Sequence, residues 1–129
     1  MKKSLFITIA VLVCASCQES LEDRCAREAK DYTEKKCPAA INEFTRIDSL
    51  TFDKATHTMH YYYTLSGNAD NAEAVAQTNP RELLVNEVRN MTAMEIYREA
   101  GYSFAYSYRS ASNPTMILFE TTIEKKDYQ

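Results

Sequence analysis

The strongest strand pattern in the chain is His57-Thr58-Met59-His60-Tyr61-Tyr62-Tyr63-Thr64-Leu65-Ser66. A large apolar side chain falls on every second residue, with mostly polar side chains between, which is typical of a strand that buries one face. Turn-forming residues 53–56 precede this stretch, and residues 49–53 alternate in the same way. We therefore expect residues 48–66 to form a β-hairpin.

A second hairpin is expected near the end of the chain. Aromatic residues alternate with small or polar ones from Tyr102 to Arg109, and residues 110–114 have the composition of a turn. The pattern over residues 115–124 then predicts a last strand that places three apolar side chains on one face, namely Ile117, Phe119 and Ile123. Residues 125–129 are interpreted as a polar tail.

A helix is expected before the first hairpin. Ser20 can act as its N-cap, and the apolar residues that follow have the spacing of one helix face: Leu21, Cys25, Ala29 and Tyr32. The remaining face is charged. We expect this helix to span about residues 20–34, with a solvated outer surface.

A second helix is expected between the hairpins. Asn79, Pro80 and Glu82 mark its start by capping chemistry, and Gly101 is placed to end it in a left-handed conformation. A further capping pattern leaves open a break near Asn90. Residues 67–78 suit either a surface loop or a short irregular helix.

The element order α-β-β-α-β-β predicts an α+β fold. We expect the two hairpins to join into one four-stranded antiparallel sheet, with the helices packed mainly on one face. The helix that begins at Pro80 would then cover an aromatic face formed by Phe52, Tyr61, Tyr63, Phe104, Tyr106 and Phe119.

The opposite face of this sheet would remain open and would mix polar with apolar side chains. Tyrosine and arginine are enriched among the residues that dominate protein interfaces. We therefore take Tyr62, Arg109 and Leu118 as a candidate partner-binding patch, for another protein or for a second copy of the chain.

The first twenty residues have the pattern of a secretory signal. Lys2 and Lys3 precede an apolar stretch over residues 5–13, which is too short to remain as a membrane-spanning helix. The segment Ala15-Ser16-Cys17 resembles the end of a bacterial lipobox, although Cys14 stands where leucine is usual. An alternative is ordinary signal cleavage near Ala15, which would give a soluble secreted protein.

The lipoprotein resemblance implies that residues 1–16 are removed and that Cys17 carries acyl chains such as palmitate. It also implies that residues 17–129 form a single lipid-anchored α+β domain in the cell envelope. Gln18 follows the cysteine, which by the familiar sorting rule favours the outer membrane. The acidic residues Glu19, Glu22 and Asp23 resemble the tethers of surface-exposed lipoproteins, but they equally suit the start of a helix.

Removing residues 1–16 leaves 13 basic and 18 acidic residues, a net charge of −5 that argues against nucleic-acid binding. It also leaves Cys25 and Cys37 beside the lipidated cysteine, and we expect a disulfide between them in an oxidising compartment. That disulfide requires the first helix to end well before Cys37; the alternatives are free or intermolecular thiols. His57 and His60 make no known zinc spacing with these cysteines, so no metal or other cofactor is expected.

No catalytic motif is present in the sequence. There is no G-x-S-x-G, H-E-x-x-H or C-x-x-C segment, and two glycines cannot form a phosphate loop. His60 with Glu120 or Asp48 is the one acid–base pair that could be imagined across the sheet, and a surface histidine is the simpler interpretation. We expect a non-enzymatic protein-binding or structural module. The alternative is a carrier of a small hydrophobic ligand, held between the aromatic face and the second helix.

Overall fold

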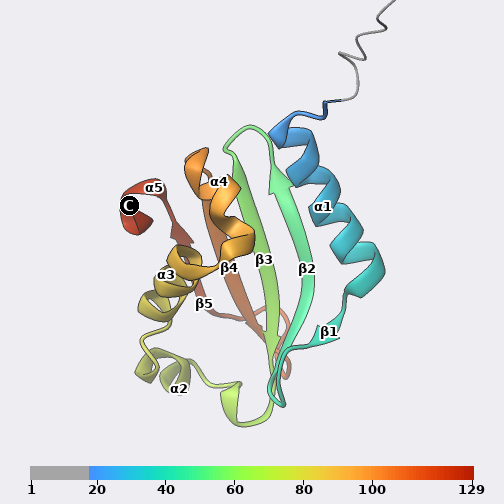
Figure 1. The fold of residues 1–129 in the computed structure, drawn as a ribbon. Coiled ribbons are helices and arrows are strands. Elements are labelled where there is room, and N and C mark those ends of the chain that lie inside the picture. The colour runs from blue at the N-terminus through green and yellow to red at the C-terminus, as the bar shows by residue number, and fades with distance from the viewer. Residues whose placement is uncertain (1–17) are drawn as a thin grey trace, which may run out of the picture.

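A computed structural model describes residues 18–129, so the predicted signal peptide and the lipidation at Cys17 lie outside the described residues. Within these residues, five strands and five α-helices follow one another (Figure 1). The strands are β1 (Ala39–Ala40), β2 (Thr45–Asp53), β3 (Thr58–Leu65), β4 (Ser103–Ser110) and β5 (Ile117–Ile123). The helices are α1 (Leu21–Lys36), α2 (Ala72–Gln77), α3 (Pro80–Asn90), α4 (Glu95–Glu99) and α5 (Lys125–Tyr128), with short 3-10 turns η2 (Gly67–Ala69) and η3 (Thr92–Met94).

The strands form one sheet in the order β1-β2-β3-β4-β5. The α+β class and both hairpins are confirmed, but the four-stranded antiparallel sheet is wrong in two respects. β1 adds a fifth strand, which at two residues is too short to give a sequence pattern. β3 and β4 pair in parallel, because the helical connection between them returns the chain to the end of the sheet where β3 began.

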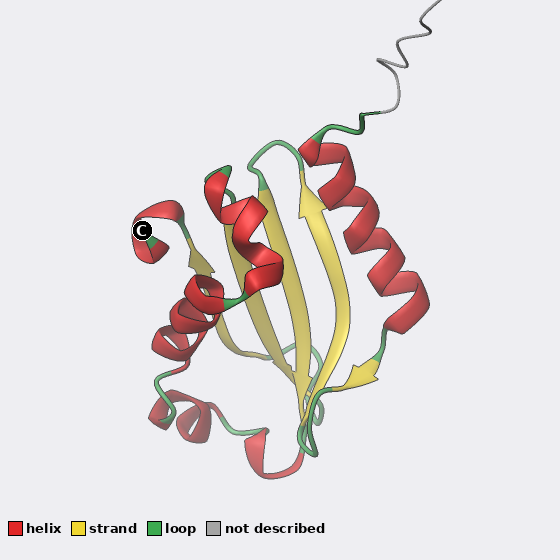
Figure 2. Ribbon diagram, viewed as in Figure 1, coloured by secondary structure: helices red, strands yellow, loops and turns green. Residues whose placement is uncertain are grey.

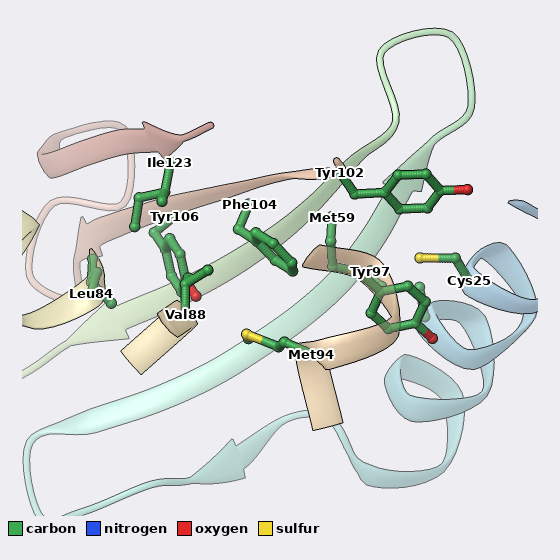
Figure 3. Close-up of a cluster of buried hydrophobic side chains, with 11 residues drawn as sticks. Cys25, Met59, Leu84, Val88, Met94, Tyr97, Tyr102, Phe104, Tyr106 and Ile123 are labelled. Carbon is green, nitrogen blue, oxygen red and sulfur yellow. The ribbon is translucent and has the colours of Figure 1, made fainter. Parts of the chain in front are cut away.

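The helices lie on one face of the sheet, as Figure 2 shows. The core forms between them and the predicted aromatic face. Figure 3 shows Phe104 and Tyr106 of β4 beside Val88 of α3, and all three side chains are at most 1% exposed. The alternation in β3 and β4 therefore predicted the buried face of the sheet correctly.

α1 is longer than expected and contradicts the predicted disulfide. It continues without a break to Lys36, and Pro38 follows shortly after its end. Twelve residues of helix separate two Cα atoms by about 18 Å, far beyond the reach of a disulfide. Cys25, fully buried against the core, and Cys37, half-buried, are accordingly free thiols.

Thr33 fastens α1 to the outer edge of β2. Its hydroxyl donates to the carbonyl of Leu50 and accepts from the N–H of Leu50, both at 2.8 Å. A side chain thus supplies the two hydrogen bonds that a neighbouring strand would supply at this position.

The second helical region is interrupted near Asn90, where the second capping pattern had left a break open. α3 ends at Asn90, and η3 and α4 follow before Gly101 adopts the expected positive φ of 77°. Pro80 occupies the first turn of α3 as predicted. Asn79 occupies the N-cap position as predicted, but it has a φ of 50° and its side chain makes no capping bond.

The end of the chain differs from the prediction at two points. Leu118 is an extra residue in β5, because Phe119 pairs with Tyr108 whereas Ile117 pairs with Arg109. This bulge turns Ile117 to the open face, 43% exposed, instead of the core face. The predicted polar tail forms α5, and the hydroxyl of Tyr128 donates to the carbonyl of Tyr102 at 2.8 Å.

Candidate functional site

The open face of the sheet contains a polar pocket that we call the open-face pocket. Its volume is about 310 Å³, and it lies where β2, β3 and β4 approach the β4–β5 turn. The residues that line it are Arg46, Asp48, Ser49, Tyr62, Thr64, Arg109, Ser110, Ala111 and Pro114. No helix within residues 18–129 covers this face (Figure 2).

A bulge in β2 builds one wall of the open-face pocket. Ile47 pairs with Tyr63 and Ser49 with Tyr62, which leaves Asp48 as an extra residue. The carboxylate of Asp48 accepts a bond of 2.7 Å from Arg46 Nε and one of 2.5 Å from the hydroxyl of Thr64. These contacts fix the carboxylate on the open face and neutralise one of the two guanidinium groups of the pocket.

The structure brings together two of the three residues of the predicted patch. Tyr62 and Arg109 both line the open-face pocket, from β3 and β4 respectively. Arg109 is exposed and forms no ion pair within the described part of the chain. Leu118 does not belong to the pocket, because the bulge in β5 displaces it and leaves it half-buried.

Sequence reasoning missed Arg46 and Asp48. Two charged residues at positions 46 and 48 are compatible with one face of a strand, which is the signal that could have found them. The strand was expected to begin only at residue 49, so Arg46 was placed in the connection before it, and Asp48 was considered only as a partner of His60. The pocket therefore holds two guanidinium groups and one carboxylate, which suits an acidic or hydroxyl-bearing segment of another molecule.

His60 lies beside the open-face pocket and forms a structural contact. Its ring stacks on Tyr62 at 4.0 Å between centroids, and its Nε2 lies 2.8 Å from the hydroxyl of Ser107. Burial lowers the pKa of His60, against the opposing effect of Glu120. Among residues 18–129 no carboxylate is hydrogen-bonded to this ring, and no group of side chains could hold a metal ion. The imagined pairs with Glu120 and Asp48 are not formed.

The helical side has an apolar pocket of about 370 Å³ between α2, α3 and the ends of β2 and β3. Leu83 at its rim is 60% exposed, whereas Leu84 and Val88 of the same helix are buried against the sheet. Leu84 and Val88 occupy the centre of the expected ligand space between the aromatic face and α3. The apolar pocket lies at the edge of that region.

Residues 20–119 match the model of a family described as a domain of unknown function, DUF8479. No curated protein matches the chain. Within residues 18–129 no helix has the length and apolar character needed to cross a bilayer.

Several solved structures share the fold. A Pseudomonas aeruginosa protein thought to be secreted is 15% identical, covers 87% of this chain and 100% of its own, and gives a TM-score of 0.66. EpsS, the pilotin of the Vibrio vulnificus type 2 secretion system, is 12% identical over 84% of this chain and 91% of its own, with a TM-score of 0.60. The type II secretion system pilotin AspS from Vibrio cholerae is 15% identical over 82% and 90%, with a TM-score of 0.57. At these identities the likeness establishes a shared fold.

Proposed function

Because the chain belongs to the DUF8479 family, whose function is unknown, we propose its role from its own residues: a lipid-anchored envelope protein that binds a protein partner through the open-face pocket. Signal cleavage would make acylated Cys17 the first residue of the mature chain, in the outer membrane. Residues 17–129 would then be one domain that acts by binding.

The observation that carries the binding role is the composition of the open-face pocket. A half-buried tyrosine, Tyr62, and an exposed arginine, Arg109, which forms no ion pair among residues 18–129, line a concave site on an uncovered sheet. Side chains of these two types supply most of the binding free energy in many protein interfaces.

The fold supports a pilotin-like version of this role. Two proteins with the same fold are pilotins of type II secretion systems, and the chain shares with them a small sheet covered by helices on one side. We propose that the partner of this chain is likewise a component of an envelope assembly. An acidic segment of that component would fit the guanidinium groups of Arg46 and Arg109.

Photo-crosslinking in cells tests the open-face pocket. A photo-reactive residue at Ser49, which lines the pocket, is expected to capture a partner, whereas the same residue at Glu73 on α2 should not. Tyr62→Ala combined with Arg109→Ala should abolish the captured band. Glu120→Ala removes a charge from the same face outside the pocket and should leave the band unchanged. A band that persists in the double variant would contradict the proposed patch.

The anchor is tested separately. The wild type is expected to carry an acylated mass and to partition into membranes, and Cys17→Ala should lose both properties. Protease treatment of whole cells would then tell whether the domain faces outward or toward the periplasm.

A carrier of a small hydrophobic ligand is the second candidate function. The apolar pocket beside Leu83 supports it, since about 370 Å³ lies within the range of small-molecule sites. Native mass spectrometry of protein purified from its host should then show an adduct that is lost in Leu84→Arg. An adduct-free spectrum of the folded wild type would reject this function.

A further inference from the structure

The chain between Cys17 and α1 is short and is part of the folded domain. Only Gln18, Glu19 and Ser20 separate the cysteine from the helix. Ser20 accepts a capping bond of 3.1 Å from the N–H of Asp23. The carboxylate of Glu19 accepts two bonds of 2.9 Å from the guanidinium of Arg27. Glu19 and Ser20 therefore belong to the folded domain.

The start of α1 is fastened to the turn between β2 and β3. Glu22 lies 2.8 Å from His57 Nε2, and Lys54 donates to Asp23 at 2.6 Å. Figure 1 shows that α4 and α5 lie at this same end of the molecule, whereas α2 lies at the opposite end. We call the start of α1, the β2–β3 turn and α5 the anchor end.

Charge pairing makes the anchor end compatible with a membrane surface. Two of the three acidic residues at the start of the described chain form ion pairs with permanent cations, Glu19 with Arg27 and Asp23 with Lys54. The third, Glu22, lies 2.8 Å from the ring of His57. Lys125 and Lys126 of α5 are exposed at the same end. Lys126 lies 3.5 Å from Glu124, whereas Lys125 forms no ion pair among residues 18–129. The ion pairs of Glu19 and Asp23 reduce repulsion from anionic headgroups, and Lys125 allows attraction to them.

We infer that the anchor end rests on the lipid headgroups, so that the domain is held against the bilayer in one orientation. This inference rests on the proposed lipidation of Cys17. Three extended residues span at most about 10 Å, so the start of α1 cannot move far from the acyl chains. The flexible tether that the acidic residues resembled is absent from residues 19–23.

This orientation determines how far the open-face pocket lies above the surface of the bilayer. Eight residues of β3 span about 25 Å, and Thr64, near the far end of β3, lines the pocket. The pocket would therefore lie about 20 Å above the surface of the bilayer. Its partner must offer the complementary segment at that height.

Fluorescence quenching in nanodiscs tests the orientation. The full-length lipoprotein, processed by cells, is placed in phosphatidylethanolamine–phosphatidylglycerol nanodiscs that contain a lipid with a nitroxide on its headgroup. In a Cys37→Ser background, a fluorophore is attached at Ala55→Cys in the β2–β3 turn or at Glu43→Cys between β1 and β2. Both positions are exposed, and they lie at opposite ends of the sheet. A water-soluble nitroxide should quench both fluorophores equally.

Quenching by the lipid nitroxide is expected to be several-fold stronger at residue 55 than at residue 43. Inserting about ten Gly/Ser residues between Gln18 and Glu19 frees the domain and should remove most of the difference. Equal quenching in a protein whose mass shows acylation would overturn the orientation and leave the anchor standing. A protein without acyl chains that stays out of the nanodiscs would overturn both.

Discussion

The two cysteines give the sharpest prediction about the folded domain, because a disulfide and two free thiols have opposite consequences for stability. A disulfide between Cys25 and Cys37 would close a loop of about 13 residues, which in the chain-entropy treatment contributes about 3 kcal/mol to the free energy of unfolding. The continuous helix between them excludes this bond. Reduction is therefore expected to leave the free energy of unfolding unchanged.

Single substitutions separate the two cysteines. Cys25 is 0% exposed, so Cys25→Ser places a hydroxyl in an apolar site and should cost about 1–3 kcal/mol. Cys37 is half-buried at the end of α1, so Cys37→Ser should change the free energy of unfolding by less than about 0.5 kcal/mol. A disulfide would instead give similar losses of about 3 kcal/mol in both variants.

The assay uses the chain from residue 18, purified without reductant, so that Cys25 and Cys37 are its only thiols. Urea unfolding is followed with and without dithiothreitol, and thiols are counted with a chromogenic reagent at pH 8. Burial raises the pKa of the Cys25 thiol to about 12, so only Cys37 should react in the native state, and two thiols should react after unfolding. No reactive thiol after unfolding, with a reductant-dependent midpoint, would refute the reasoning.

Three further predictions concern the packing of the helices on the sheet. Thr33→Val leaves the N–H and carbonyl of Leu50 without partners and should lower the free energy of unfolding by about 1–3 kcal/mol, whereas Thr33→Ser should retain most of the stability. Equal urea midpoints for the two variants would contradict this. Phe104→Ala empties the centre of the core and should cost about 3–5 kcal/mol, measured by urea unfolding. The N–H of Glu124 donates to the carboxylate of Asp127 and lowers its pKa below the ordinary 3.8 in the folded state. The ionised carboxylate therefore stabilises the fold above about pH 4, and this stabilisation is lost as the pH falls through the lowered pKa. Asp127→Asn should reduce the loss of stability between pH 5 and about pH 2.5, and an unchanged pH profile would reject that assignment.

Most of the fold could be predicted because the spacing of apolar residues and the residues that begin or end a helix are visible in the sequence. These signals do not depend on which strand lies next to which. The alternation around Tyr61 and Tyr106 identified the buried face, and Pro80 and Gly101 marked the bounds of the second helical region. The direction in which β3 and β4 pair could not be read, since the same alternation fits a parallel or an antiparallel neighbour. The alternating pattern of a strand also does not indicate the residue at which a bulge exchanges the buried and open faces.

The candidate site illustrates the same limit. Tyr62 and Arg109 were found by alternation, because both lie in regular parts of their strands. Leu118 lies outside the pocket and Asp48 lines it, and each is the extra residue of a bulge. Bulges concentrate where a sheet shapes a site. Sequence alternation therefore failed at the two positions that most affect the outline of the pocket.

The parallel pairing of β3 with β4 also determines when the domain can form as the chain is made. β3 is complete at Leu65, yet its parallel neighbour begins only at Ser103. Until that neighbour emerges, the first hairpin has an open edge beside its row of tyrosines and cannot close its core. A chain that emerges from N- to C-terminus therefore cannot complete its sheet until most of its residues have been made.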